Sequence, residues 1–376
     1  MLIKNGQIHD AIHEKPYTAD IAVENGKIAA IAPGLAPKAG EEVVDAAGLQ
    51  VYPGFVDAHT HIGLDGFGNG SAGKDFNEKY HPNTPENRGV DGFYAQDPGI
   101  REALKGGVTT VCTGPGSSNT LGGTFFAFKT AGGRLETMLL KEPVAMKCAF
   151  GENPKATYPK SGCASRMGVA ARVREALYAA REYLEKKEAG KDCKFDLGLE
   201  ALVPVLKKEL PLKAHVHRAD DILTAIRIAR EFDVKMTLEH CTEGHLIVED
   251  LVEAGFPCAI GPLLSAWAKV ELQQKCAETA AILDQAGLPV CIITDAPVVL
   301  PQYLAASAGA AAAVGMDRFS ALQAITIRAA RHIGVEDRVG SLEVGKDADI
   351  LLKDGDALDC SRPIRTVFVG GERVLG

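Results

Sequence analysis

Two histidines in the segment GFVDAHTHIG, residues 54–63, have the clearest potential for chemistry in this chain. His59 and His61 are two positions apart, so both side chains point to the same face if the segment forms a β-strand. Two imidazoles on one face at the end of a strand can bind one metal ion. An isolated H-x-H pair can equally be two polar histidines at a strand end, so the motif needs support from the rest of the chain.

Further polar residues end other apolar segments. His215 and His217 lie in KAHVHRADD, His240 closes VKMTLEH, and Asp295 closes CIITD. In an α/β barrel the carboxyl ends of the strands meet on one face, where active sites lie. Each residue alone could be a buried histidine or a helix-capping aspartate, but together they favour a shared site with the H-x-H pair.

The elements that must position these residues alternate between strand and helix from Phe55 to about Ile333. Residues 167–187 and 220–231 carry apolar side chains at helical spacing. The apolar strands are expected at 107–114, 143–150, 212–217, 234–240, 256–261 and 288–295. Repeated strand–helix units predict a parallel sheet, here a (β/α)8 TIM barrel. An open doubly wound sheet is the alternative, although no G-x-G-x-x-G follows a first strand.

Both ends of the chain read as short strands separated by turns. The pairs Asn5-Gly6 and Asn25-Gly26 predict hairpins near the start, and Asp354-Gly355 and Gly370-Gly371 predict turns near the end. We therefore expect residues 1–52 and 340–376 to form one small β-sandwich domain. Residues 53–339 would then form the barrel domain.

Composition limits the class of protein. The net charge of -8 argues against a general nucleic-acid binder. Nine cysteines without a C-x-x-C pair indicate reduced thiols, and the start MLIKNGQIHD lacks the apolar core of a signal peptide. The Ala-rich run 304–314 is too short to span a bilayer. We predict a cytoplasmic protein that acts on a small molecule, with no nucleic-acid or membrane partner; a homo-oligomer stays open.

The chain resembles the amidohydrolase superfamily, and within it the branch of imidazolonepropionase and prolidase-type enzymes. The similar stretches are ADIAVENGKIAAIAPG, VVDAAGLQVYPGFVDAHTHIG, ITDAP and RVGSLEVGKDADILL. The resemblance implies a metal held by ligands from several strands, and in binuclear members a second metal bound by a further histidine. The implied ligands are His59, His61, His215 and Asp295, with His240 joining the second metal.

Two ligand assignments follow from the resemblance. Family patterns place the ligand first in the strand that carries KAHVH, so we assign His215 to the metal and His217 to the substrate side. Lys147, in VAMKCAFGENPK, matches the lysine that is carboxylated in binuclear relatives and bridges two metals. A lysine in an apolar strand is costly unless it is paired or modified. The alternative for Lys147 is a substrate carboxylate or an ion pair with Glu152.

Arg218 departs from the pattern of deaminases and imidazolonepropionase-like members, which usually carry an acid at this position. It could bind a substrate carboxylate or form a surface ion pair with Asp220 or Asp221. Tyr158 and Arg166, in the loop 151–168, are further candidates for substrate contacts. So are the Gly-rich turn 113–123 and the long run 63–99, which is rich in Gly, Asn and Pro.

These residues predict a metal-dependent hydrolase that attacks a C–N bond with metal-activated water. Asp295 would move the proton, and His240 or His217 would stabilise the developing oxyanion. Zinc is the default metal, with one or two ions per chain. The substrate would be a small amide, cyclic amide or ureide, or a dipeptide-like compound. The alternatives are a heterocycle deaminase, a non-catalytic metal-binding scaffold, and a metal-independent sugar or phosphate barrel enzyme.

Overall fold

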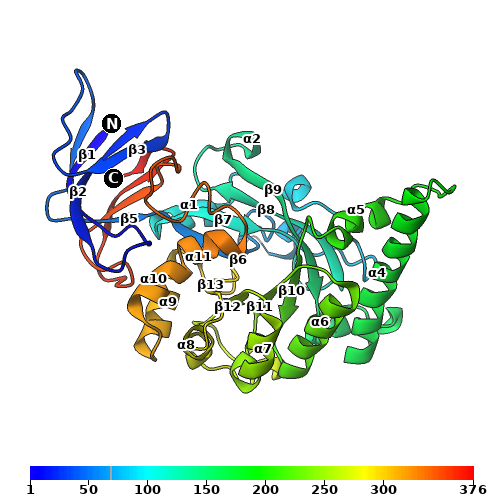
Figure 1. Cartoon of the computed structure of the whole chain (residues 1–376). Coiled ribbons are helices and arrows are strands. Elements are labelled where there is room, and N and C mark those ends of the chain that lie inside the picture. Colours follow the sequence, from blue (N-terminus) through cyan, green and yellow to red (C-terminus); the bar gives the residue numbers. More distant parts are fainter. Residues whose placement is uncertain (68–69) are drawn as a thin grey trace.

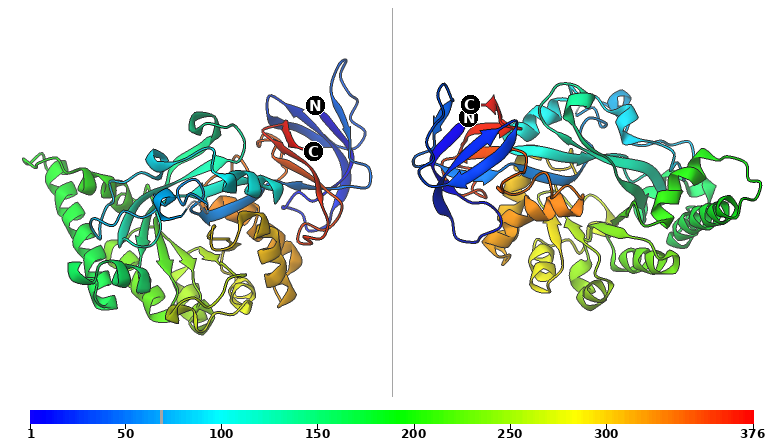
Figure 2. Two further views of the ribbon diagram at one scale, coloured as in Figure 1. Left: turned by 180° about the vertical axis from the view of Figure 1, so that it is seen from behind. Right: turned by 45° about the horizontal axis from the view of Figure 1, so that its top comes forward.

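The chain forms two eight-stranded sheets, and the helices pack around one of them (Figure 1). The computed structural model describes residues 1–67 and 70–376. Both termini lie in the same sheet, at one end of the molecule, in every view (Figure 2). The other sheet curls into a barrel, and the long helix α4 (Arg166–Glu188) lies at the end of the molecule opposite the termini.

The terminal sheet has the strand order β16-β15-β14-β5-β1-β2-β3, with β4 paired to β1. Its strands are β1 (Leu2–Ile8), β2 (Tyr17–Glu24), β3 (Lys27–Ala32), β4 (Val43–Asp45), β5 (Gln50–Pro53), β14 (Ile350–Lys353), β15 (Ile364–Val369) and β16 (Glu372–Leu375). Ile21 from β2, Ile350 from β14 and Phe368 from β15 share one buried cluster. This sheet confirms that the two ends of the chain fold together. The predicted domain boundaries at 52/53 and 339/340 stay a prediction.

The turn predictions had different outcomes. Asn25 and Gly26 connect β2 to β3 with φ values of 52° and 76°, the left-handed geometry of a tight hairpin. Gly370 and Gly371 connect β15 to β16 in the same way. The hairpin predicted at Asn5-Gly6 is wrong, because this pair lies inside β1 where the register with β2 shifts. Asn5 has φ 63°, so the left-handed residue forms a bulge instead of a turn.

The barrel sheet has the order β13-β12-β11-β10-β9-β8-β7-β6. Its strands are β6 (Phe55–Thr60), β7 (Val108–Thr113), β8 (Leu121–Lys129), β9 (Leu139–Ala149), β10 (Leu212–Val216), β11 (Met236–His240), β12 (Cys258–Ile260) and β13 (Val290–Ile292). The edges β6 and β13 come together beyond the end of β13, where the amide of Asp295 donates to the carbonyl of His59 at 3.1 Å. This nearly closed sheet confirms the α/β barrel class.

One barrel strand was not predicted and runs in the opposite direction. β8 pairs antiparallel with both β7 and β9, so the sheet is parallel only outside this meander. Its sequence LGGTFFAFK carries two glycines directly after Leu121, and these glycines led to the prediction of a turn over 113–123. The expected run of strand–helix units is therefore interrupted at this point, since the described residues 114–120 between β7 and β8 contain no helix.

Helices follow most of the remaining barrel strands (Figure 1). α4 and α6 (Ala219–Phe232) match the two helices predicted from apolar spacing. The other helices are α1 (Pro98–Lys105), α2 (Leu135–Met138), α3 (Glu152–Thr157), α5 (Leu197–Leu206), α7 (Val248–Ala254), α8 (Glu278–Gln285), α9 (Leu304–Ala313), α10 (Arg318–Ala324) and α11 (Ile327–His332). No helix in the described residues is both long and apolar enough to cross a membrane.

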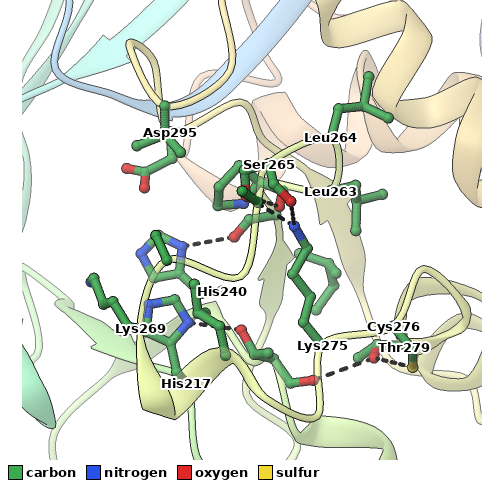
Figure 3. Close-up of a pocket in the computed structure, with 18 residues that line it drawn as sticks. His217, His240, Leu263, Leu264, Ser265, Lys269, Lys275, Cys276, Thr279 and Asp295 are labelled. Carbon is green, nitrogen blue, oxygen red and sulfur yellow. Dashed lines mark hydrogen bonds between the residues drawn. The ribbon is translucent and has the colours of Figure 1, made fainter.

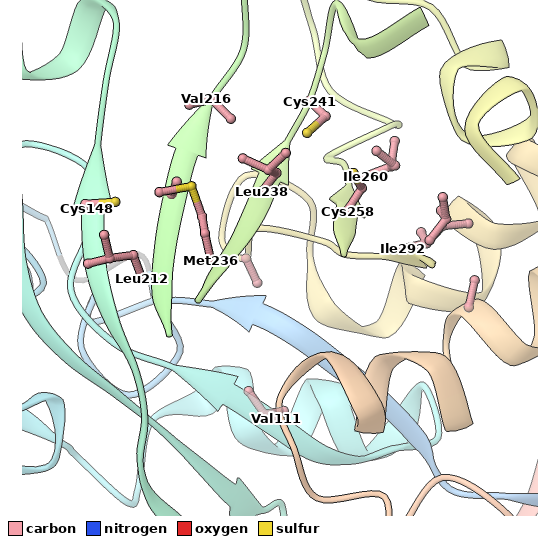
Figure 4. Packing of buried hydrophobic residues seen from close by; sticks show 14 of the residues in the cluster. Val111, Cys148, Leu212, Val216, Met236, Leu238, Cys241, Cys258, Ile260 and Ile292 are labelled. Atoms are coloured by element: carbon pink, nitrogen blue, oxygen red, sulfur yellow. The ribbon is translucent and has the colours of Figure 1, made fainter. Parts of the chain in front are cut away.

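Alternation along the strands separates the packing layer from the chemical layer. On β10, Leu212, Ala214 and Val216 belong to the large apolar cluster that includes the helix residues Ile222 and Ile226 (Figure 4). The residues between them are Lys213 and His215, which are buried as well. Because successive side chains on a strand point to opposite faces, packing the even positions under the helices turns the odd positions into the barrel.

The run 63–99 connects β6 to α1 and lies partly beside the barrel mouth. Gly68 and Asn69, within this run, lie outside the described residues. Asn83 and Arg88 form parallel bridges to β8. The ring of Phe76 packs on His61 with centroids 5.1 Å apart. The segment around Phe76 therefore forms part of the surroundings of the H-x-H pair.

Candidate metal centre and pocket

Strand ends bring the predicted residues together at one end of the barrel. His59 lies on β6, His215 on β10 and His240 at the end of β11, while Asp295 follows β13. Donor atoms of His59, His240 and Asp295 all lie within 4.8 Å of one another. Donor atoms of His215, His217 and His240 form a second such group. The two groups share His240, so the arrangement could hold one or two metal ions.

The imidazole of His59 is fixed by a buried carboxylate. Its Nδ1 donates to Glu239 at 2.8 Å, and both side chains are fully buried. A carboxylate can only accept, so the proton stays on Nδ1 and Nε2 keeps its lone pair. Burial lowers the pKa of His59 well below its ordinary value, with a further lowering from the nearby Lys147 ammonium. His59 is therefore a neutral imidazole that is ready to act as a ligand.

His61 and His240 are fixed by main-chain carbonyls. His61 donates from Nδ1 to the carbonyl of Gly114, and His240 donates from Nδ1 to that of Gly261, both at 2.8 Å. Both therefore keep the Nε2 lone pair. Burial lowers the pKa of His240 to about 4. This is how proteins orient metal-binding histidines: the outer nitrogen donates to an oxygen and the inner nitrogen faces the ion.

Asp295 supplies the carboxylate of the centre. Its Oδ1 lies 3.4 Å from Nε2 of His61 and 3.9 Å from Nε2 of His59. Burial alone would raise the pKa of Asp295, but His240 and the H-x-H pair around it hold the pKa well below the ordinary value. Asp295 and His240 have φ values of 53° and 73°. Such left-handed conformations cost about 1–3 kcal/mol each in non-glycine residues and cluster at functional sites.

A buried atom without a partner shows that these residues fit a metal. Nε2 of His215 is buried, and no hydrogen-bond partner for it lies among the described residues. Burial is the main reason that the pKa of His215 is well below the ordinary value, so the ring is neutral. A buried polar atom without a hydrogen bond is expensive, and a divalent cation would satisfy this nitrogen. Imidazole and carboxylate donors suit zinc and its neighbours in the periodic table.

Lys147 lies fully buried on β9, beside the histidines. Its Nζ is 3.2 Å from Nε2 of His59, and no carboxylate oxygen of the described residues comes within 4.0 Å of it. Burial lowers the pKa of Lys147 to about 8, although Asp295 and Glu239 act in the opposite direction. The predicted alternative of an ion pair with Glu152 does not occur among the described salt bridges. The neutral fraction of this amine near neutral pH is therefore larger than that of an ordinary lysine, although the ammonium form still predominates.

Sequence reasoning missed the charged layer below the centre. Glu239 is fully buried and accepts from Nζ of Lys213, Nε2 of His332 and Nδ1 of His59, each at 2.8 Å. Burial alone would raise the pKa of Glu239, but Lys213 and His332 hold it well below its ordinary value. A charged residue inside the apolar segment VKMTLEH was the available signal, since buried charges require partners.

The three residues predicted to contact substrate lie outside this centre. Arg218 forms a two-point ion pair with Asp220 at 3.0 Å and is partly exposed. Tyr158 donates to the carbonyl of Glu78 and accepts from Asn119, which ties the loop after β9 to the run 63–99. None of these three lines the pocket described below.

Arg166, the third of them, begins α4 and donates from Nε to Asp221 at 2.8 Å. Its Nη2 lies 3.9 Å from Glu271, a buried residue whose other oxygen lies 3.9 Å from Nε2 of His217. Arg166 is therefore connected to the site through Glu271 and has no direct contact with the predicted ligands among its described interactions.

A pocket of about 440 Å³ opens beside His217, His240 and Asp295 (Figure 3). Its other walls come from the irregular segment 261–276 that follows β12, which carries Leu263, Leu264 and Ser265. Two lysines, Lys269 and Lys275, also line it. Asp295 is the one carboxylate among the described lining residues, so any acid–base chemistry by a carboxylate in this pocket falls to Asp295.

The fold and the donor set together define a barrel with residues suited to a divalent metal, and comparison with known proteins places the chain more closely. The sequence model of the amidohydrolase family matches residues 50–374. The chain therefore belongs to the amidohydrolase family. This confirms the family expected from the sequence motifs.

Relatives and solved structures agree with this membership. The chain is similar to an amidohydrolase from Thermotoga maritima MSB8, with a TM-score of 0.96 and 38% identity over 100% of this chain and 99% of that one. It is 27% identical to an amidohydrolase of Hapsidospora irregularis over 94% of this chain but only 40% of that protein. A prolidase complexed with N-methylphosphonate-L-proline shares the fold, with a TM-score of 0.62 and 16% identity over 100% of this chain and 99% of that one.

Proposed function

We propose that this chain is a metal-dependent hydrolase that cleaves a C–N bond of a small amide, a cyclic amide or ureide, or a dipeptide-like compound. The observation that carries the proposal is the orientation of the imidazoles. His59, His61 and His240 each donate from Nδ1 to an oxygen, so each keeps an Nε2 lone pair in the region that contains Asp295. Family membership supports a hydrolase of this type.

The metal would be held by donors from β6, β9, β10 and β11 and from the segments that follow β6 and β13. We assign this role to His59, His61, Lys147, His215, His240 and Asp295, with Lys147 in its carboxylated form. Zinc suits the imidazole and carboxylate donors, and two ions would suit the bridging anion made from Lys147. Such an ion would supply a Lewis acid that lowers the pKa of a water molecule to about 7.

Asp295 would carry the proton during hydrolysis. Its carboxylate is ionised over the neutral range, because the surrounding histidines hold its pKa low. It lies on the pocket wall and can reach a substrate bound there. We assign to it the transfer of a proton from the attacking water to the leaving nitrogen.

The two neighbouring histidines would have different roles. His240 is neutral and uses its only proton on Gly261, so its Nε2 cannot donate to an oxyanion. In contrast, Nδ1 of His217 lies 2.7 Å from the hydroxyl of Thr242, which can donate to it. We assign the donor role in this contact to Thr242, which places the proton of His217 on Nε2. We therefore assign ligand binding to His240 and stabilisation of the negative oxygen to His217.

Substitution of each histidine by glutamine tests this division. We expect H217Q to keep its metal content and to lose about 10²–10³ in kcat, the usual effect of removing one oxyanion donor. We expect H240Q to lose bound metal as well as activity. Elemental analysis and release of free amine from a panel of N-acyl amino acids, cyclic ureides and dipeptides would be measured in parallel.

The outcomes separate the proposal from its rivals. Ammonia release from heterocyclic amines, with no hydrolysis in the panel, would favour a deaminase. A wild-type protein that keeps its metal and is inactive on every compound would favour a binding scaffold. Loss of metal in H217Q, with metal retained in H240Q, would reverse the two assigned roles.

A further inference from the structure

Lys275 is a half-buried ammonium group on the pocket wall that lacks a carboxylate partner. No carboxylate oxygen among the described residues lies within 4.0 Å of its Nζ. It donates to the main-chain carbonyl of Ser265 and, at 2.9 Å, to the hydroxyl of the same residue. Burial lowers the pKa of Lys275. The ammonium charge of Lys275 is therefore partly removed from water without a compensating anion.

The geometry leaves one hydrogen-bond donor unused. An ammonium group carries three protons, and Ser265 accepts two of them. No further acceptor contacts Nζ in the part of the chain that the structure describes. Figure 3 shows the side chain crossing the pocket toward Ser265, next to Leu263. A lysine whose only role is to fix the segment at Ser265 would not need to place its ammonium group on the pocket wall.

The other charged groups of the pocket are already compensated. Lys269 lies 3.4 Å from the buried carboxylate of Glu271. Asp295 belongs to the proposed ligand set, so a bound metal ion would compensate its charge. Much of the remaining lining is apolar and includes Leu263, Leu264, Leu272 and Val298, while Thr242 and Thr279 supply hydroxyl groups. An apolar pocket with one uncompensated cation favours a ligand that is apolar and carries one negative charge.

We propose that Lys275 binds an anionic group of the substrate, a carboxylate attached to an apolar chain, and so determines the substrate class. This inference rests on the proposed hydrolase function of the same pocket. The neutral C–N bond to be cleaved would lie at the His217 and Asp295 end of the pocket. The carboxylate would lie at the Ser265 end and take the third proton of Lys275. Charge-assisted hydrogen bonds of this type are about twice as strong as neutral ones.

A matched substrate pair tests the proposal by kinetics. N-acetyl-L-leucine and N-acetyl-L-leucinamide differ only in the carboxylate, and acetate release reports cleavage of the same bond in both. In the metal-loaded K275M variant we expect kcat/KM to fall at least tenfold for the acid and less than threefold for the amide. K275R should keep the preference for the acid. As a control, K269M should change the ratio of the two values by less than threefold, because Glu271 already neutralises Lys269.

Equal losses for both compounds in K275M and in K275R would overturn the proposal, because they would mean that Lys275 only fixes the segment at Ser265. A preference for the acid that K275M leaves unchanged would overturn it too.

A binding measurement separates this inference from the proposed reaction. Calorimetric titration would compare the binding of 4-methylvalerate with that of its neutral counterpart 4-methylvaleramide. This measurement does not depend on cleavage of either compound. We expect the metal-loaded wild type to bind the carboxylate at least tenfold more tightly than the amide, and K275M to lose this preference. This result without hydrolysis of any test compound would support Lys275 as the anion site and count against the proposed reaction. Equal carboxylate binding by wild type and K275M would place the anion elsewhere and overturn the inference.

Discussion

Replacing Asp295 by asparagine is expected to lower kcat by about 10³–10⁴ while most of the bound metal is retained. General acid–base catalysis contributes about 10²–10⁴, and loss of the only carboxylate among the described pocket-lining residues leaves no replacement for it. Asparagine has the same shape and keeps one oxygen toward His61, so the other ligands can still hold an ion. Steady-state kinetics and elemental analysis of the same preparation would measure both quantities.

Asp65 provides a matched control for this substitution. It is a buried aspartate near His61 and lies 3.9 Å from Lys74, but it does not line the pocket. We expect D65N to keep kcat within about threefold of wild type, because Asp65 does not line the pocket and has no acid–base role there. Wild-type turnover in D295N would remove Asp295 from the mechanism. Complete loss of metal in D295N would show that its main role is as a ligand.

Replacing Glu239 by glutamine is expected to lower the free energy of unfolding by about 3–5 kcal/mol, the usual result of removing one partner of a buried ion pair. Lys213 is 1% exposed and depends on Glu239 for its compensating charge. His59 would also lose the carboxylate that orients its ring, so we expect metal affinity to fall about 10- to 100-fold. Urea unfolding of the metal-free protein and competition with a chelator would measure the two effects separately.

The surface pair of Glu142 and Arg88 supplies the comparison for that variant. Their closest atoms lie 2.6 Å apart, and the Arg88 side chain is 55% exposed. E142Q should lower the free energy of unfolding by no more than about 1 kcal/mol. Equally small effects of E239Q and E142Q on the free energy of unfolding would mean that the ion pair of Glu239 with Lys213 does not stabilise the fold.

The barrel and its chemical face could be predicted because strand geometry repeats. Side chains two positions apart share a face, and polar residues that end apolar strands meet at one end of a barrel. This geometry predicted a shared site for His59, His61, His215, His217, His240 and Asp295. In the structure His59 lies with His240 and Asp295, His215 lies with His217 and His240, and His61 lies 3.4 Å from Asp295. Apolar strands that alternate with amphipathic helices predicted the α/β class of the fold.

What escaped prediction depends on contacts between distant segments. Gly122 and Gly123 near the start of β8 are typical of a turn, and only the pairing of this segment with β7 and β9 makes it a strand. Asn5 has the same left-handed preference in a bulge as in a hairpin, so residue type alone does not distinguish the two. Lys275 lies in an irregular segment without periodicity, and its missing carboxylate partner is visible only in three dimensions.

The metal content per chain, measured by elemental analysis of protein purified without added metal or chelator, is the decisive test of the proposed metal centre. We expect about two equivalents of divalent metal, and about one in K147M, because a carboxylated Lys147 would hold both ions. One equivalent in both proteins would remove Lys147 from the ligand set and leave a mononuclear centre. No bound metal in the wild type, with no activity restored by adding zinc, would contradict the account.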